Sequence, residues 1–265
     1  MRKWKRNIVL SMTMVFIGMF LAGAYYLDNK TKSKEVSKNE IVKNDKAKKQ
    51  EKGKKKVKKS NVIESAKKYA VPAKEVNAML NGKKNGKKEV FLTFDDGPSK
   101  NTPEILKILK KYKVHGTFFV LGSNVENSSA NKKYVKDAYK SGNAIANHTY
   151  SHNFKKIYPR NRVDVKAFMG EYHKTDKILK GVLGSNFETK VMRMPGGYMS
   201  RKYYKDKNLG ALNKALNKEK IVSIDWNIDS TDTSAVRVPA NKIVSNTIKA
   251  VRNSEDIVLL MHDAG

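Results

Sequence analysis

The chain has 265 residues, enough for one large domain or two small ones, and 55 Lys and Arg against 25 Asp and Glu give it a formal net charge of +30. It contains no cysteine, which excludes a disulfide framework and a thiolate metal site. The first 60 residues hold 18 basic and five acidic side chains, and the remainder holds 37 and 20. The basic excess is therefore not confined to one tail, and we expect the folded part to suit an anionic matrix.

Residues 1–27 have the pattern of a membrane anchor. Residues 1–6 carry four basic side chains and no acid, and residues 8–27 contain no charged side chain, which is long enough to cross about 30 Å of hydrocarbon as a helix. The basic flank predicts a cytoplasmic N-terminus, with residue 28 onward outside the cell. A cleaved signal peptide, which would make the protein secreted, is the alternative because residues 21–24 are small. We favour an uncleaved single-pass anchor because the apolar run exceeds a usual signal core.

Residues 28–60 form a Lys-rich segment with 14 Lys, five acidic residues and no aromatic residue. Such a segment cannot bury enough surface to offset its ordering entropy, which predicts a disordered tether. Its charge could attract nucleic acid. Outside a membrane the expected counter-ions are instead anionic envelope polymers and lipid headgroups, so we do not expect a nucleic-acid partner.

The rest of the chain predicts an α/β domain. Residues 61–87 have a helical pattern interrupted at Pro72 and followed by a Gly- and Lys-rich turn, which predicts a lead-in or cap. From residue 88 strand and helix patterns alternate, which predicts a parallel sheet, open or closed into a barrel. The predicted strands are 90–94, 117–121, 144–146, 191–194, 221–226 and 257–261, and the predicted helices are 103–112, 131–141, 163–183, 207–217 and 241–252.

Polar side chains follow five of these strands. Because catalytic groups of parallel barrels sit at the carboxyl ends of the strands, this arrangement predicts an active site on one rim. The strand-end residues are Asp95 and Asp96, Asn147 and His148, Arg193, Asn227 and Asp229, and His262 and Asp263.

Asp95 and Asp96 end the first predicted strand. Successive side chains of a strand face opposite sides, so these two can share a site only where the alternation relaxes, and Gly97-Pro98 offers such an exit. Adjacent carboxylates repel unless a cation, a proton or an Arg lies beside them. The pair therefore predicts a metal or an Arg at the same rim.

His148 and His152 are candidates for metal ligands because a four-residue spacing can aim both imidazoles at one point. With one carboxylate, from Asp95 or Asp96, they would make a three-ligand site. Zinc with an open position fits this ligand set, and ferrous iron is the alternative.

Arg193 and His262 are the other chemically competent strand-end residues. On the rim, Arg193 would lower the pKa of one aspartate, and its alternative is a surface arginine before a turn. His262 follows an apolar strand, where an imidazole can act as a proton donor, and its alternative is a buried structural histidine.

The motifs together resemble those of a known family. They look like the five ordered motifs of the polysaccharide deacetylase family of carbohydrate esterases, in particular its membrane-anchored peptidoglycan N-acetylglucosamine deacetylases of Gram-positive bacteria. The resemblance covers residues 88–265 and implies a distorted (β/α) barrel that hydrolyses an N-acetyl group with a metal. The motifs are 93–98 (TFDDGP), 148–152 (HTYSH), 193–197 (RMPGG), 229–232 (DSTD) and 259–263 (LLMHD).

The resemblance also implies a role for each residue. Asp95 would be the general base oriented by Arg193, and His262 the general acid held by Asp229. A divalent metal, Zn²⁺ first and Co²⁺ or Mn²⁺ as alternatives, would be bound by Asp96, His148 and His152. Tyr198 and Trp226 would line the sugar groove, with a backbone N–H near Tyr198 stabilising the oxyanion, although either ring could instead belong to the core.

Three departures from the family pattern keep other functions open. Thr233 stands where the family usually has Trp, and His115, where a small residue is common, is expected to be structural like His173. The chain ends three residues after His262, so the barrel is expected to be incomplete at its C-terminal end. The alternatives are an O-acetyl polysaccharide (xylan-type) esterase, a chitooligosaccharide deacetylase, and a non-catalytic wall-binding protein that keeps the fold.

Overall fold

The computed structural model describes residues 59–234 and 238–264. The predicted anchor and all but the last two residues of the predicted tether lie outside these ranges. Within them, no helix is both long and apolar enough to cross a membrane. The described residues hold the whole of the predicted α/β domain except 235–237 and 265.

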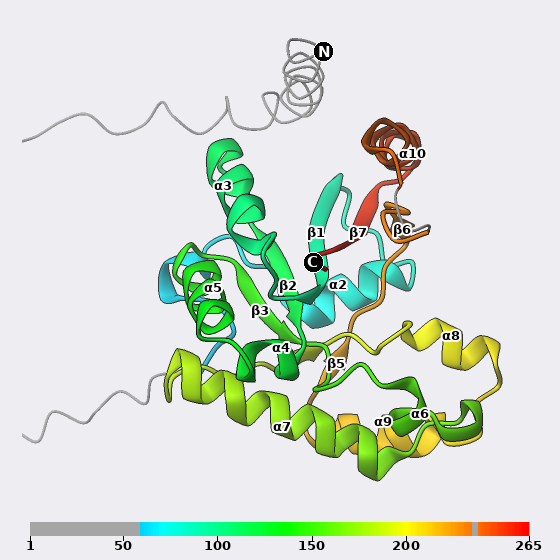
Figure 1. Cartoon of the computed structure of the whole chain (residues 1–265). Coiled ribbons are helices and arrows are strands. Elements are labelled where there is room, and N and C mark those ends of the chain that lie inside the picture. The colour runs from blue at the N-terminus through cyan, green and yellow to red at the C-terminus, as the bar shows by residue number, and fades with distance from the viewer. Residues whose placement is uncertain (1–58, 235–237, 265) are drawn as a thin grey trace, which may run out of the picture. The chain divides into compact units, whose positions relative to one another are not determined.

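A curled sheet of seven parallel strands forms the framework of the domain (Figure 1). The strand order is β5-β4-β3-β2-β1-β7-β6, and every ladder is parallel, as the strand–helix alternation predicted. The strands are β1 (Glu89–Gly97), β2 (Gly116–Val120), β3 (Ala144–Asn147), β4 (Val191–Met192), β5 (Val222–Ser223), β6 (Ile228–Asp229) and β7 (Asp256–His262).

All five helices predicted after residue 88 are present, with their ends within two residues of the predicted ones. Side-chain caps begin two of them: Ser128 accepts from Asn131 N before α5, and Asp164 accepts from Ala167 N before α7. Three short helices that follow strands were not predicted, because they are too short for a periodic pattern. The helices are α2 (Ala73–Leu80), α3 (Thr102–Tyr112), α4 (Gly122–Glu126), α5 (Ser129–Lys140), α6 (Phe154–Ile157), α7 (Val165–Leu183), α8 (Tyr198–Tyr203), α9 (Leu209–Lys218) and α10 (Ala240–Arg252), with 3₁₀ turns at Glu64–Ala66 and Pro159–Asn161.

The single strand predicted at 221–226 was wrong. The chain instead forms β5 at one edge of the sheet, crosses through residues 224–227, and forms β6 at the other edge. Five Cα steps span at most about 18 Å, so this link brings the two edges close together. Among the described residues no ladder joins β5 to β6, and the sheet is a curled barrel that is open between them. The C-terminal strand β7 pairs on both sides, so the opening is not where the sequence predicted it.

The two faces of the sheet bury different cores. Phe118 and Phe119 are neighbours in β2 and point to opposite faces, and each is about 1% exposed. Phe118 packs in a cluster with side chains of α3, α5 and α7 on the outer face. Phe119 packs on the inner face with Val76 of α2. Because α2 also contacts β5 and β7, the segment predicted as a lead-in or cap packs against the inner-face residues of the barrel.

Candidate active site

Asp95 and Asp96 share one site because β1 contains a bulge. Asp95 pairs with Phe119 and Gly97 with Val120, which leaves Asp96 as an extra residue with φ of 67°. The alternation of the strand is broken at this point. The predicted relaxation of the alternation is therefore confirmed, but it occurs within the strand and one residue before the Gly97-Pro98 turn.

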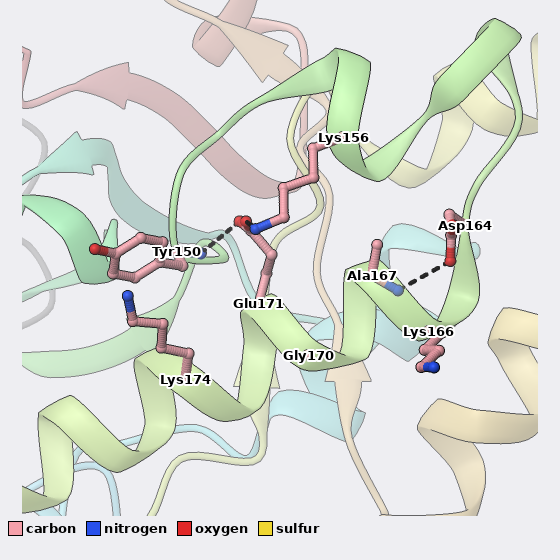
Figure 2. A pocket seen from close by; sticks show the side chains of 8 residues that line it. All are labelled: Tyr150, Lys156, Asp164, Lys166, Ala167, Gly170, Glu171 and Lys174. Atoms are coloured by element: carbon pink, nitrogen blue, oxygen red, sulfur yellow. Dashed lines mark hydrogen bonds and ion pairs between the residues drawn. The ribbon is translucent and has the colours of Figure 1, made fainter.

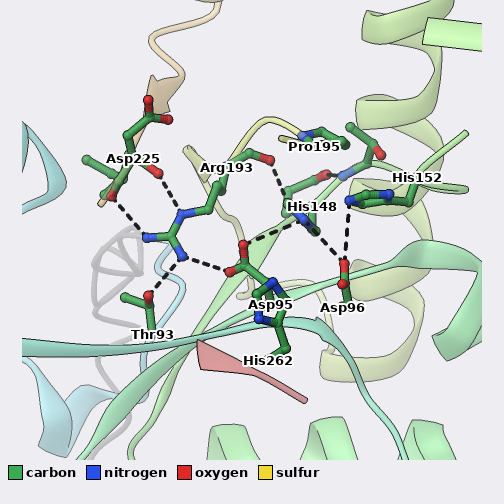
Figure 3. A network of polar contacts seen from close by, with 12 residues as sticks. Thr93, Asp95, Asp96, His148, His152, Arg193, Pro195, Asp225 and His262 are labelled. Atoms are coloured by element: carbon green, nitrogen blue, oxygen red, sulfur yellow. Dashed lines mark hydrogen bonds and ion pairs between the residues drawn. The ribbon is translucent and has the colours of Figure 1, made fainter. Parts of the chain in front are cut away.

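Asp96, His148 and His152 form a cluster suited to a metal ion (Figure 3). His148 Nε2 and His152 Nε2 lie 3.4 and 3.6 Å from Asp96 Oδ1, and the three ligand atoms lie within 4.8 Å of one another. Asp96 Oδ1 is buried and has no hydrogen-bond partner among the described residues. Because an orphaned buried carboxylate oxygen is costly, a cation between these groups fits the donor set. The structure thus selects Asp96 over Asp95 as the carboxylate nearest both imidazoles.

The orientation of the His148 ring is set by a hydrogen bond from its Nδ1 to the main chain. Its Nδ1 lies 2.8 Å from the carbonyl oxygen of Arg193, which accepts a hydrogen bond from Nδ1–H and leaves Nε2 facing Asp96. Metal-binding histidines characteristically have such a partner on the second ring nitrogen. His148 is 2% exposed, whereas His152 is partly exposed. The candidate metal site is therefore buried on the His148 side and open to solvent on the His152 side.

Arg193 is fully buried, so the surface-arginine alternative was wrong. Its Nη1 donates to Asp95 Oδ1 and to Thr93 Oγ1, both at 2.8 Å. Its Nε and Nη2 donate to two carbonyl oxygens of the 224–227 link at 2.9 and 3.0 Å. The guanidinium also lies over the Phe119 ring at 4.3 Å. Arg193 therefore ties Asp95 to the link that crosses the opening of the barrel (Figure 3).

His262 is held by Asp232, and the predicted pairing with Asp229 was wrong. His262 Nδ1 lies 2.8 Å from Asp232 Oδ1, and the His262 amide donates to Asp232 Oδ2 at 2.7 Å. The register of β6 places Asp229 opposite Leu260, two residues short of His262, and the exposed Asp229 carboxylate accepts from the amide of Thr231. The turn after β6 brings Asp232 back to His262. The motif 229–232 contains two aspartates, Asp229 and Asp232, so the sequence already offered a second candidate for the partner of His262.

The pair His262–Asp232 favours a protonated imidazole. Burial lowers the pKa of His262, but the hydrogen bond and negative charge of Asp232, with the charges of Asp95 and Asp96, outweigh it and raise the pKa above its ordinary value. Burial raises the pKa of Asp232, but its bonds to His262 lower it overall. An imidazole that keeps its proton to higher pH than an ordinary histidine suits the predicted role of proton donor.

Of the two rings that the sequence left open between groove and core, Tyr198 takes the core alternative and Trp226 stays half-buried. The amides of Tyr198 and Met199 donate to the two carboxylate oxygens of Asp225 at 2.8 Å. The Tyr198 amide is therefore engaged and does not serve as an oxyanion donor in this arrangement. Its ring packs against a buried cluster, whereas the half-buried Trp226 packs so closely on Gly197 that a Cβ there would lie 3.0 Å from the Trp226 ring.

Besides Asp229, three more of the predicted strand-end residues do not join the site. Asn227 bonds to main-chain groups of β7, and the Asn147 side chain bonds to Tyr172 O and Thr149 N. Asp263 is buried at the start of α3 and accepts from the hydroxyls of Ser99 and Thr102 at 2.9 and 2.5 Å. Burial raises the pKa of Asp263 to about 6. These side chains organise the loops around the site.

Phe154 is a residue of the site that the sequence did not indicate. It begins α6, two residues after His152, and its ring lies edge-on to the His152 imidazole with centroids 5.2 Å apart. The side chain is 43% exposed, which is high for a large apolar residue. It also lies against Gly196 of the turn that follows Arg193. Phe154 is therefore an exposed aromatic wall beside the candidate metal ligands.

Comparison with known proteins agrees with this geometry. The family model described as polysaccharide deacetylase matches residues 82–213. A peptidoglycan-N-acetylglucosamine deacetylase of Bacillus cereus is 31% identical over 217 residues, which cover 78% of this chain and 71% of that protein. Among solved structures, a Streptococcus mutans CE4 esterase has a TM-score of 0.68 and 32% identity, covering 77% of this chain and 84% of that one. The catalytic domain of a Eubacterium rectale peptidoglycan N-acetylglucosamine deacetylase has a TM-score of 0.59 and 29% identity, covering 68% and 79%. The chain belongs to the polysaccharide deacetylase family.

Proposed function

We propose that this protein removes the N-acetyl group of N-acetylglucosamine residues in peptidoglycan, releasing acetate and leaving a free amine. The observation that carries the proposal is the convergence of the Asp96–His148–His152 cluster with the Arg193-bound Asp95 on one rim (Figure 3). Two of the relatives compared above are named for this activity.

The chemistry can be divided among the residues of the site. A divalent cation held by Asp96, His148 and His152, for which we propose Zn²⁺ with Co²⁺ or Mn²⁺ as substitutes, would supply Lewis-acid polarisation of the acetyl carbonyl. Asp95 accepts the Arg193 bond at Oδ1, which leaves Oδ2 to take a proton from the attacking water. His262 then donates a proton to the departing nitrogen, because an unprotonated amide anion is a poor leaving group.

The turn after Arg193 and the aromatic residues around it would receive the acetylated sugar. Gly197 N donates to Met194 O and Tyr198 N donates to Asp225, whereas the Gly196 amide makes no hydrogen bond to a described residue. We place the oxyanion donor at Gly196 N for this reason. Phe154 and the half-buried Trp226 would contact the sugar rings, and they stand in for the tryptophan that the family usually has where this chain has Thr233.

Acetate release from purified peptidoglycan tests the proposed function. The protein should release acetate, a chelator should abolish the release, and added Zn²⁺ should restore it. His152→Ala, which removes one ligand, should remain inactive after the same addition, because two protein ligands do not hold the ion in an open-site geometry. Release from acetylxylan or chitooligosaccharides but not from peptidoglycan would favour one of the other esterase or deacetylase functions. Release from none of these substrates would favour the wall-binding alternative.

We further propose that the domain lies outside the cell, anchored by residues 8–27, with the Lys-rich tether 28–60 contacting anionic envelope polymers. The support is the sequence pattern of a basic flank before an uncharged run. Protease added to intact protoplasts should therefore remove the domain, and a cytoplasmic reporter protein should survive as the control. Protection of the domain until the membrane is lysed would contradict this topology, and recovery of the domain in the medium would indicate cleavage.

A further inference from the structure

Glu171 is a buried carboxylate that the proposed chemistry does not use. It lies in the middle of α7, and its side chain is 2% exposed. Acidic side chains are rarely buried to this extent unless they are paired and hydrogen-bonded, because the desolvation of the charge is costly. The position of Glu171 therefore requires partners, and all of them come from the segment that carries the two histidines of the candidate metal site.

The Glu171 carboxylate accepts from two consecutive amides of the 148–152 loop. Tyr150 N lies 3.1 Å from Oε2 (Figure 2). Ser151 N lies 2.7 Å from the same oxygen, and the Ser151 hydroxyl lies 2.9 Å from the carboxylate. Lys156, in the short helix α6 that follows the loop, places its Nζ 2.8 Å from Oε1 and balances the charge (Figure 2). Tyr150 and Ser151 lie between His148 and His152, so Glu171 is hydrogen-bonded to the main chain that links the two candidate ligands.

The opposite edge of the loop is held by α4. The amides of Gly122 and Ser123 donate to the carbonyl oxygens of Thr149 and Tyr150 at 3.0 and 2.9 Å. The loop thus turns its carbonyl groups toward the start of α4 and its amide groups toward Glu171. The peptide units 149–150 and 150–151 are hydrogen-bonded on both sides, and the loop lies between two helices that contact each other.

The clamped conformation is one that the loop residues do not favour by themselves. Thr149 and His152 have φ of 68° and 53°, a region that non-glycine residues adopt rarely, and least of all a β-branched residue such as Thr149. Such residues keep this conformation only where the surroundings determine it. The hydrogen bonds that the loop donates to Glu171 and accepts from α4 hold this conformation, in which both Nε2 atoms converge on Asp96.

We propose that Glu171 is a positioning residue for the metal site: it holds the two loop amides so that His148 and His152 present their Nε2 atoms at ligand distance from Asp96. It contacts neither Asp95 nor His262 and has no part in proton transfer. The inference rests on the proposed function only for its effect on turnover. Its effect on metal affinity can be measured whatever the substrate proves to be.

Glu171→Gln tests the proposal because it keeps the size of the side chain and replaces one acceptor oxygen by an NH₂ group that faces donors. Zn²⁺ affinity should fall about 10- to 100-fold in competition with a chromophoric chelator, the usual effect of losing an outer partner of metal ligands. The absorption spectrum of the Co²⁺-loaded protein should also change, because the angles between the ligands change. At saturating Zn²⁺, kcat for acetate release should fall while KM stays near the parent value.

Glu126→Gln is the matched control. Glu126 of α4 also contacts the loop, but through the Tyr150 hydroxyl at 2.7 Å and not through the main chain, and it pairs with Lys174 on the surface. This variant should keep the parent Zn²⁺ affinity and Co²⁺ spectrum. A folded Glu171→Gln protein with parent affinity and spectrum would overturn the proposal and leave Glu171 with a role in stability alone.

Ser151→Ala keeps the test decisive if Glu171→Gln does not fold. It removes one hydroxyl donor to Glu171 and leaves the buried carboxylate paired with Lys156 and the two amides. Zn²⁺ affinity should fall about three- to tenfold, on the order of the net contribution of one hydrogen bond, because the other partners of Glu171 remain. Parent affinity in this variant, with Glu171→Gln unfolded, would likewise overturn the proposal.

Discussion

Replacing Asp95 by Asn is expected to lower turnover by about two to four orders of magnitude while leaving metal binding nearly intact. Asp95 is the carboxylate bound by Arg193, and its free Oδ2 lies 3.7 Å from His148 Nε2, so it can receive a proton within the site. Asparagine keeps the size of the side chain and one acceptor oxygen for Arg193. It removes the proton-accepting oxygen and leaves Asp96 and both histidines in place.

Asp96→Asn is the matched variant, and in it the loss of metal should come first and cause the loss of turnover. It removes the carboxylate that faces both imidazoles, so Zn²⁺ should be lost first and activity should return in part at high Zn²⁺. Zinc stoichiometry and kcat measured on both variants decide between the two roles. Metal loss in Asp95→Asn with retention in Asp96→Asn would reverse them.

Asp232→Asn is expected to move the alkaline limb of the pH–rate profile to lower pH and to lower kcat at pH 7 by about ten- to a hundredfold, part of the factor that a positioned proton donor supplies. In the parent protein Asp232 raises the pKa of His262 against the opposing effect of burial, so the acid form persists to higher pH. Without the carboxylate the effect of burial remains, the pKa falls, and the proton donor is lost earlier as the pH rises.

Asp229→Asn is the control for this experiment because Asp229 is exposed and bonds only to the nearby Thr231 amide among the described residues. Its profile should overlay that of the parent protein. If Asp229→Asn moved the alkaline limb and Asp232→Asn left it in place, the pairing predicted from the sequence would describe the active protein better than the geometry seen here.

Much of the framework could be predicted because it depends on local patterns. The apolar runs of β1, β2 and β7 and the amphipathic repeats of α3 and α7 report burial directly, so their order and their approximate ends follow from the sequence. The polar residues at the strand ends could be grouped for the same reason, since parallel strands present their carboxyl ends on one rim. His148, His152, Arg193 and His262 were found in this way.

Contacts between segments could not be predicted from such patterns. β5 and β6 are two residues each, and nothing in residues 221–226 indicates that the chain leaves one edge of the sheet and joins the other. Glu171 and Phe154 carried no signal either. A glutamate in an amphipathic helix is usually a solvated residue, and only the packing of α7 against the 148–152 loop shows that this one is buried.

The fold class, the family resemblance and the residues that gather at the rim followed from the sequence, because periodicity and motif spacing are properties of neighbouring positions. The partner of each carboxylate became clear only in the folded chain. A bulge of one residue in β1 separates Asp96 from Asp95, and the register of β6 against β7 with the turn that follows gives His262 to Asp232 and not to Asp229. Register and turn geometry are set by contacts between distant segments. A shift of one or two residues along a strand, about 3 Å each, is enough to place a different aspartate beside the metal site or beside His262.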